Sequence, residues 1–247
     1  MYFNERSIFM NHFEVITASK TWTCPKTGIY KIIAVGGGSS GAIYATFSNI
    51  TAKKVNSKVV CTAGGNTTFG SLLTAKGGNI TAYSQIDYGN TSSVLQLFGG
   101  AGGYTLQNYG GIGGYMQHSL NVQPTINGGF PGYPGNGYGA GGTIGTKLES
   151  YNSTIDSNNY SFKLVPFGSM AGDLNELICD IAVNTSYACA IGSGGTVTAS
   201  ALQSVVSAVD SSMVSNTNIA ALISTAVNFS RPGKSGCIVI EYLGESY

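Results

Sequence analysis

The run Ile29-Tyr30-Lys31-Ile32-Ile33-Ala34-Val35-Gly36-Gly37-Gly38 is the stretch on which the fold depends. Its first seven residues are almost continuously apolar, which predicts a buried β-strand, and the glycines end that strand. Before it, Pro25-Lys26-Thr27-Gly28 predicts a turn, because proline presets φ and glycine accepts a positive φ. Residues 13–24, rich in aromatic and β-branched side chains, predict a strand that leads into this turn.

A second strong strand closes the chain. Cys237-Ile238-Val239-Ile240-Glu241-Tyr242 follows a turn at residues 231–234, and further strands are predicted at 42–47, 55–62 and 67–73. We therefore expect a mainly β fold: a single β-sandwich domain over residues 1–247, jelly-roll-like. Residues 30–35 and 237–242 should both lie in its buried core, since a sandwich commonly brings the chain ends together.

Residues 88–146 form an insertion without any Asp, Glu, Lys or Arg. They contain two copies of Gly-Gly-x-Gly-Gly-Tyr, which end at Tyr104 and Tyr115. A period of three with two glycines suits extended helices of the polyproline II shape, which pack closely because no Cβ atoms separate them. A disordered linker is the alternative, and the interleaved Tyr, Ile, Leu and Phe residues argue against it.

Residues 170–228 predict a partly helical insertion before the closing strand. Leu174, Leu177, Ile178 and Ile181 recur at helical spacing, with Asp173 as a candidate N-cap. The same period recurs at residues 202–213 and 219–226, so two or three short helices are expected in the C-terminal third.

Composition excludes several classes of protein. Charged residues make up 9% of the chain and the net charge is +1, so no basic patch for nucleic acid is expected. No apolar run is long enough to insert into a membrane, and the first residues lack the pattern of a signal peptide. Five scattered cysteines without a C-x-x-C pair favour reduced thiols. These features predict a protein assembled in a cytoplasm.

Gly36-Gly37-Gly38-Ser39-Ser40-Gly41 matches the G-x-G-x-x-G pattern of dinucleotide-binding proteins. That site needs a helix after the glycines and an acidic residue about 20 positions later. Here the following residues favour a strand, and no acidic residue occurs between Glu14 and Asp87. The pattern is therefore interpreted as a strand-to-loop transition that binds no phosphate.

Other catalytic patterns are also incomplete. His12 and His118 are the two histidines, and neither is near a cysteine pair that would hold zinc. Ser193 lies among glycines but lacks the G-x-S-x-G spacing of a nucleophile elbow. The sequence thus predicts no catalytic residue, no metal and no cofactor, and the protein is not expected to be an enzyme.

Several segments, in their order, resemble the glycine-rich domain of bacteriophage tail-fibre and tail-tip proteins. The opening Thr21-Trp22-Thr23-Cys24-Pro25 with the apolar strand and glycine run is similar to that family's start, with Cys24 replacing its usual Val. Residues 59–70 and 187–195 resemble its strand-and-glycine units, and residues 233–242 resemble its closing strand. The helical pattern between residues 170 and 227 departs from the family.

The resemblance implies a non-enzymatic virion component of a phage tail tip or tail fibre that helps to bind a receptor on the host surface. A purely structural virion protein, such as a tail or baseplate adaptor or a decoration protein, is the alternative; a dinucleotide-binding enzyme using Gly36–Gly41 is a remote one. Expected partners are other tail proteins, a bacterial surface glycan or protein, and further copies of the chain, with a trimer favoured.

Aromatic residues beside the glycine tracts are the candidate receptor contacts, since such side chains give contact area at low entropic cost. They are Tyr104, Tyr109, Tyr115, Phe130, Tyr133 and Tyr138.

Overall fold

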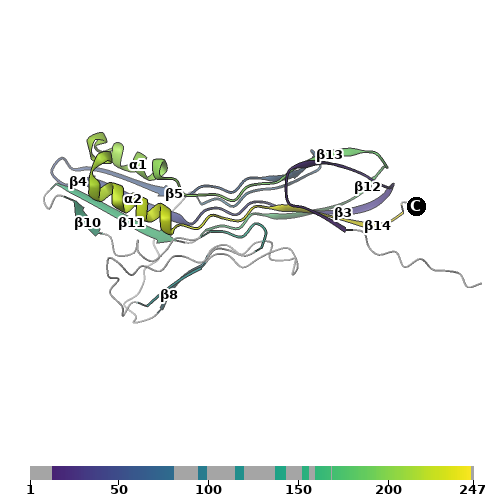
Figure 1. The fold of residues 1–247 in the computed structure, drawn as a ribbon, viewed down its shortest axis with the longest axis horizontal. Helices are drawn as coiled ribbons and strands as arrows, with labels where there is room; N and C mark the ends of the chain where they lie inside the picture. The colour runs from purple at the N-terminus through teal and green to yellow at the C-terminus, as the bar shows by residue number, and fades with distance from the viewer. Residues whose placement is uncertain are drawn as a thin grey trace, which may run out of the picture.

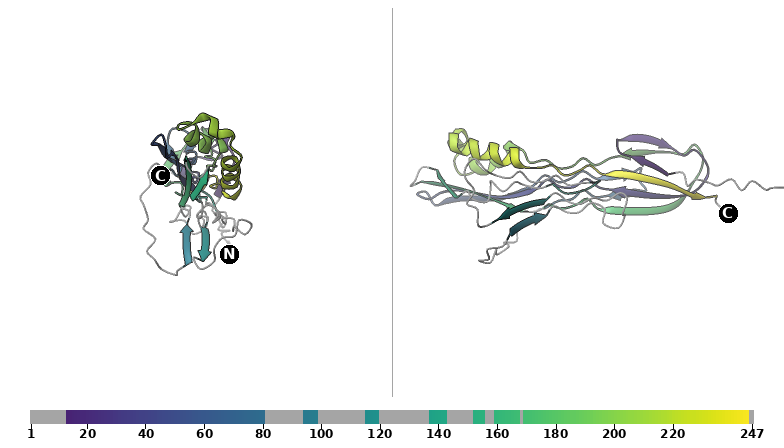
Figure 2. Two further views of the ribbon diagram at one scale, coloured as in Figure 1. Left: turned by 90° about the vertical axis from the view of Figure 1, so that its left-hand side faces the viewer. Right: turned by 60° about the horizontal axis from the view of Figure 1, so that its bottom comes forward.

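The protein is an elongated, mainly β molecule with two differently built ends (Figure 1). The computed structural model describes residues 13–80, 94–98, 115–119, 137–142, 152–155, 159–167 and 169–245. One end consists of two β-sheets and is called here the sheet end. The other, the helix end, consists of a third sheet covered by helices, and long extended segments join the two ends (Figures 1 and 2).

The sheet end contains two four-stranded antiparallel sheets. Sheet A has the order β1-β14-β3-β12 and sheet B has the order β2-β13-β6-β7. The strands of sheet A are β1 (Phe13–Ile16), β14 (Cys237–Gly244), β3 (Gly28–Val35) and β12 (Leu174–Ile181). Those of sheet B are β2 (Lys20–Thr23), β13 (Ser186–Ala190), β6 (Thr67–Phe69) and β7 (Leu73–Ala75).

The expected placement of the first apolar strand and the closing strand in one buried core is confirmed, and the two strands are also direct neighbours. β3 lies beside β14, with Ile32 opposite Ile240 and Ile33 opposite Val239. Ile32 and Ile240 are buried in a cluster to which sheet B contributes Trp22 and Phe69. The two apolar strands therefore form the centre of the sheet end.

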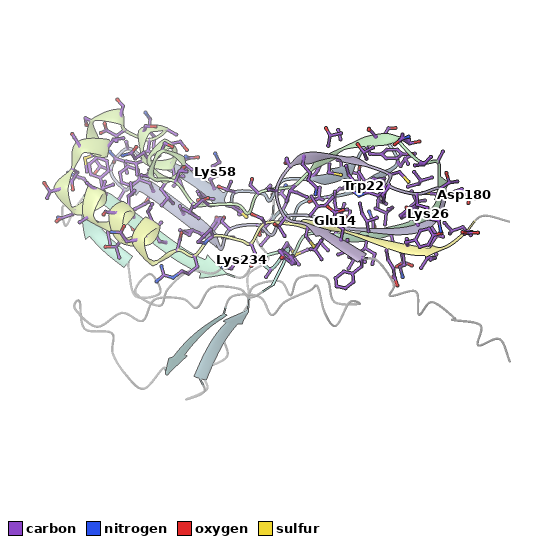
Figure 3. All side chains as sticks on the ribbon, turned by 45° about the vertical axis from the view of Figure 1, so that its right-hand side comes forward. Glu14, Trp22, Lys26, Lys58, Asp180 and Lys234 are labelled. Atoms are coloured by element: carbon purple, nitrogen blue, oxygen red, sulfur yellow. The ribbon has the colours of Figure 1, made fainter. Side chains whose placement is uncertain are left out.

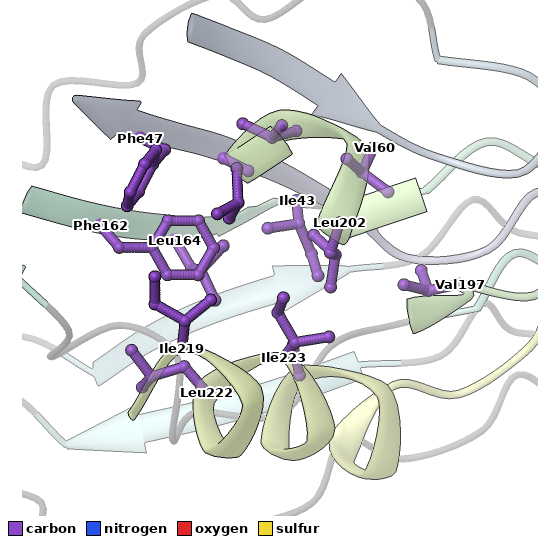
Figure 4. Close-up of a cluster of buried hydrophobic side chains, with 14 of the residues drawn as sticks. Ile43, Phe47, Val60, Phe162, Leu164, Val197, Leu202, Ile219, Leu222 and Ile223 are labelled. Carbon is purple, nitrogen blue, oxygen red and sulfur yellow. The ribbon is translucent and has the colours of Figure 1, made fainter. Parts of the chain in front are cut away.

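The helix end is built on sheet C, with the order β10-β11-β4-β5. Its strands are β10 (Asn152–Ile155), β11 (Tyr160–Phe167), β4 (Ala42–Asn49) and β5 (Lys54–Val60). The helices α1 (Ala199–Ser207) and α2 (Thr217–Phe229), with the short 3-10 helix η2 (Ser211–Ser215) between them, cover one face of this sheet. A second buried cluster fills the interface, and Figure 4 shows Phe47 and Phe162 of the sheet near Ile219 and Leu222 of α2.

Sequence and structure agree on the helices at α1 and α2 but differ over Leu174–Ile181. These residues form β12, which pairs with β3 along its whole length. Leu177, Cys179 and Ile181 also alternate along a strand, and they are less exposed than Ile178 and Asp180 between them. Pairing with a buried neighbouring strand therefore outweighs the helical spacing, and the predicted helix at this position was wrong.

Two further expectations need correction. Residues 13–24 do not form one strand: β1 pairs with β14 in sheet A, whereas β2 pairs with β13 in sheet B. The single strand expected at residues 67–73 is a β6–β7 hairpin, with Gly70 at φ +52° in the turn. Beyond these sheets, β8 (Val94–Phe98) and β9 (Tyr115–Ser119) form a two-stranded antiparallel pair.

Candidate functional site

The most unusual feature of the molecule is the set of extended segments that joins its two ends. Residues 36–41 form the central segment, which leads from β3 to β4. Its backbone amides donate in turn to three neighbouring segments, at N–O distances of 2.9 Å: Gly36 to Asp173, Gly37 to Gly65, Gly38 to Lys234, Ser39 to Met170 and Ser40 to Thr62. The first donor, Gly36, and the fourth donor, Ser39, therefore bond to the same segment, residues 169–173. This period of three is that of a polyproline II helix, which has three residues per turn and no internal hydrogen bonds.

The carbonyl groups of the central segment bond to three other segments. Gly37 accepts from the amide of Gly78 at 2.8 Å, while Gly38 and Ser39 accept from Gly195 and Gly142 at 2.9 Å. The central segment thus has six neighbours, three that accept its amide protons and three that donate to its carbonyl oxygens.

The six outer segments also bond to one another and close a ring. Going round it, they are residues 169–173, 76–79, 61–66, 191–197, 231–236 and 137–142. Each contact around the ring carries at least one backbone hydrogen bond: Asp173 to Lys76, Gly64 to Gly78, Gly65 to Ser193, Gly233 to Gly195, Lys234 to Ala140 and Gly172 to Gly139. These seven segments are called the glycine bundle below.

Glycine is required where adjacent segments of the bundle approach each other most closely. A Cβ atom added to Gly36, Gly37 or Gly38 would lie 2.1 Å from a backbone carbonyl oxygen of an adjacent segment. Such an approach forces the backbones apart, because no flexible side chain is present to move aside. Among the described residues, the segments of the bundle are joined by backbone hydrogen bonds, and the buried apolar clusters lie mainly in the two ends.

The geometry of the bundle bears directly on the G-x-G-x-x-G pattern. A dinucleotide site needs free amide groups at the start of a helix. Here the amides of residues 36–40 all donate to protein carbonyl groups, and the segment continues into β4 rather than a helix. The glycines of this pattern serve the close approach of protein backbones.

Apart from residues 137–142, which belong to the insertion expected to be extended, the outer segments were not predicted. Gly64 and Gly65, which lie between two predicted strands, donate to two different segments of the bundle. The available signal was the recurrence of paired glycines between strands, at 64–65, 77–78, 141–142 and 194–195. Each pair alone is compatible with a turn, and their common role depends on contacts between distant parts of the chain.

At the tip of the sheet end, a shallow hollow is lined by Pro25, Lys26, Thr27, Val183 and Glu245. Lys26 Nζ bonds to Glu245 Oε1 at 2.9 Å on the exposed surface. This bond raises the pKa of Lys26 and lowers the pKa of Glu245. The hollow is open, and its two charged side chains, Lys26 and Glu245, are paired with each other, so its lining does not resemble an active site.

The thiols are poorly suited to nucleophilic chemistry. Cys24, Cys61, Cys179, Cys189 and Cys237 all lie in described segments and form no disulfide. Burial raises the pKa of Cys237 to about 12 and also raises the pKa of Cys179 and Cys189. Because the thiolate is the reactive form, these three groups are held in their unreactive state at neutral pH.

Of the predicted receptor contacts, Tyr138 is the one whose side chain the structure describes. It is partly buried and packs against Ile33, Val35, Cys237 and Val239 on the face of sheet A that points away from sheet B. Tyr104, Tyr109, Phe130 and Tyr133 lie outside the described residues, and Tyr115 is described as part of the backbone of β9. The structure therefore does not bring these six residues together into a described surface.

Side chains are dense at the two ends and sparse along the bundle (Figure 3). Within the described segments, no three His, Cys, Asp or Glu side chains gather in a way that would hold a metal ion. No helix in the same segments is both long and apolar enough to cross a membrane.

Comparison with known proteins gives no further guide to the site. No family model matches the chain, and neither a curated protein nor a solved structure does. The case for a function therefore depends on the sequence and on the geometry described above.

Proposed function

We propose that this protein is a non-enzymatic virion component of a phage tail tip or tail fibre that contributes to binding the host surface. The observation that carries the proposal is the ring of six glycine segments around a seventh. Such a bundle suits a spacer, since it sets two folded ends at a fixed separation by backbone bonds alone. A spacer with two different ends fits a part that attaches to a particle at one end and presents a surface at the other.

The surface chemistry supports recognition rather than catalysis. The exposed sides of α1 and α2 carry small uncharged residues, among them Ser200, Ser204, Asn218, Ser224 and Asn228. Tyr, Ser, Gly and Asn are the residues typical of recognition loops. The same residue types fill the uncharged insertion at residues 88–146.

We propose that this insertion carries the receptor contacts, with Tyr104, Tyr109, Tyr115, Phe130 and Tyr133 as candidates. Tyr138 is not among the proposed contacts, because it packs against a buried cluster.

The finer architecture is part of the proposal. We interpret sheets A and B as a β-sandwich, because they share one buried cluster. The glycine tracts at residues 99–103 and 110–114 are proposed to adopt the same extended shape as the segments of the bundle. The chain is proposed to act as a homo-oligomer beside other tail proteins, and to be assembled in the host cytoplasm.

Adsorption of the purified protein to bacteria tests the proposal. Fluorescently labelled protein is expected to bind saturably to cells of a susceptible strain and to compete with intact phage. Tyr104→Ala, Tyr115→Ala and Tyr133→Ala should each reduce adsorption while leaving the melting temperature unchanged. Tyr138→Ala is the matched comparison and should lower the melting temperature.

A purely structural virion protein remains the second candidate, because the bundle serves an adaptor equally well. Immunogold labelling of intact particles separates the two. Label at the distal end of the tail, together with adsorption, supports the adhesin. Label along the tail or capsid without adsorption supports the adaptor or decoration protein.

A further inference from the structure

Two sheet edges at opposite ends of the molecule have matching and opposite charge patterns. β12 is an outer strand of sheet A at the sheet end, and β5 is an outer strand of sheet C at the helix end. Within the described segments, each strand pairs with a neighbour on one side only: β12 with β3 and β5 with β4. An outer strand of this length presents backbone donors and acceptors to which a further strand can add.

The exposed charges on each edge have one sign. β12 carries Glu176 and Asp180, and β5 carries Lys54 and Lys58; all four residues are exposed. In both strands the two charges are four residues apart and therefore lie on the same face, about 13 Å from each other at about 3.3 Å per residue. The equal spacing allows both opposite-charge pairs to form in one register, whether the strands run parallel or antiparallel.

We propose that β5 of one copy of this chain pairs with β12 of a second copy. The contact is an added-strand interface, in which backbone hydrogen bonds join sheet C of one copy to sheet A of the next. Lys54 and Lys58 then lie opposite the two acidic residues of the partner's edge. The inference concerns self-assembly and does not depend on host attachment.

The charges also determine which edges can meet. Two copies of β5 would bring lysines opposite lysines, and two copies of β12 would bring carboxylates opposite carboxylates, and both arrangements are unfavourable. Pairing between unlike edges is the combination without such repulsion. Charged side chains on an edge normally prevent aggregation; here they select a single partner edge.

The exposed apolar side chains of the two strands do not meet in this register. Ile178 of β12, 57% exposed, lies on the face of Glu176 and Asp180, whereas Val55 of β5, 66% exposed, lies on the face opposite Lys54 and Lys58. The contact therefore depends on the backbone hydrogen bonds and the two charge pairs. Glu176 already bonds to Lys31 within the chain, at 3.0 Å between Nζ and Oε2. The Glu176 side chain is 53% exposed in this pair, so its carboxylate is also accessible from outside the sheet.

The positions of the edges determine the kind of assembly. Figure 3 shows Lys58 near the helix end and Asp180 at the tip of the sheet end. An interface between two different surfaces of the same chain is heterologous, so each copy has one edge of each kind to offer. Such contacts give a closed ring if the rotation closes and a chain of copies if it does not.

Sedimentation of the purified full chain tests the pairing. The wild-type protein should self-associate at low salt, and added salt should weaken the association because exposed charges are screened. Lys54→Glu with Lys58→Glu gives one variant, and Glu176→Lys with Asp180→Lys gives a second. Each variant alone has two edges of like sign and should self-associate at least about tenfold more weakly than the wild type.

Mixing the two variants is the decisive step. Each variant then offers the edge that the other lacks, so an equimolar mixture should recover the association of the wild type. The neutral pairs Lys54→Gln with Lys58→Gln and Glu176→Gln with Asp180→Gln replace any charge-reversal variant whose thermal unfolding shows that it has not folded. A monomeric wild type at low salt, or variants that associate like the wild type, would overturn the proposal. So would a mixture of folded charge-reversal variants that stays as weak as its components.

Discussion

The amide of Gly38 donates a hydrogen bond of 2.9 Å to the carbonyl oxygen of Lys234, which joins the first glycine segment of the bundle to the last. On its other side, the carbonyl of Gly38 accepts from the amide of Gly195. One residue without a side chain thus connects three segments that are far apart in the sequence. Stability at this point depends on backbone contacts that any side chain would interrupt.

Gly37→Ala is expected to prevent stable folding. The new Cβ would lie 2.1 Å from the carbonyl oxygen of Ser193, and separating the two segments would break hydrogen bonds on both sides. The expected loss exceeds the usual cost of about 1–3 kcal/mol for overpacking, because the obstacle is backbone. Chemical denaturation of purified protein measures this loss.

Gly65→Ala provides the matched control in an outer segment. Its Cβ would lie 2.9 Å from the amide nitrogen of Ser193, so a smaller shift accommodates it. The variant should fold and lose less stability than Gly37→Ala. Equal losses for the two substitutions would contradict the role assigned to the central segment.

Ile240→Asp is expected to unfold the sheet end. Ile240 is 3% exposed and packs in the cluster shared by sheets A and B, where an unpaired carboxylate costs several kcal/mol. Fluorescence of Trp22, the single tryptophan, reports on the same cluster. Ile50→Asp is the control, because Ile50 is 55% exposed and should tolerate the charge. A soluble Ile240→Asp variant with an unchanged Trp22 spectrum would contradict the placement of β14 in this core.

Asp210 is expected to make the stability of the helix end depend on pH. Hydrogen bonds from Ser212 and from the Tyr160 hydroxyl lower the pKa of Asp210. Because the folded-state pKa lies below the unfolded one, the contribution is complete above the unfolded pKa and is lost as the pH falls through the folded pKa. Asp210→Asn should therefore lower the melting temperature at neutral pH and have little effect in acid.

Thermal unfolding of the wild type and Asp210→Asn between neutral and acidic pH measures this difference. Tyr160→Phe removes one of the two donors and should show a smaller dependence of the same sign. A difference between wild type and Asp210→Asn that grows as the pH falls would rule out the assigned direction.

Thiol labelling should distinguish the cysteines by burial. Cys24 and Cys237 are fully buried, and the pKa of Cys237 is raised to about 12, so neither should react with a thiol reagent in the native protein at neutral pH. Cys61 and Cys179 are both partly exposed, and Cys61 should react first because burial raises the pKa of Cys179. All five cysteines should react in guanidinium, and Cys61→Ser should remove the fast phase. Rapid labelling of Cys237 in native protein would show that the strand around it opens.

The sequence was informative where a segment has a single strong pattern. Continuous apolar runs identified β3 and β14 as buried strands, and the tendency of chain ends to meet placed them in one core; their direct pairing was not predicted. The helical period at residues 202–213 and 219–226 identified the helices that cover sheet C. Each of these patterns lies within one short segment, and the spacing of its apolar residues indicates directly which side chains are buried.

Patterns that depend on distant partners were misread. Leu174–Ile181 fits a helix and a strand equally in sequence, and the free edge of β3 decides between them. In the sequence, paired glycines between strands are compatible with turns and do not by themselves predict a bundle. Extended glycine segments are stable only when several lie side by side. The match of residues 36–41 to a nucleotide-binding pattern arose from the same need for close backbone approach, here to protein instead of pyrophosphate.

The ring around the central segment also constrains how the molecule is made during translation. Residues 36–41 are synthesised well before residues 231–236, among which Lys234 accepts from Gly38. The amide of Gly38 must therefore stay solvated until residues 231–236 are available. Contacts of this sequence separation make folding slow and leave a long interval in which unpaired strands can associate wrongly. Completion of the bundle thus waits for residues 231–236, and the yield of folded protein should increase when a chaperone shields the waiting chain.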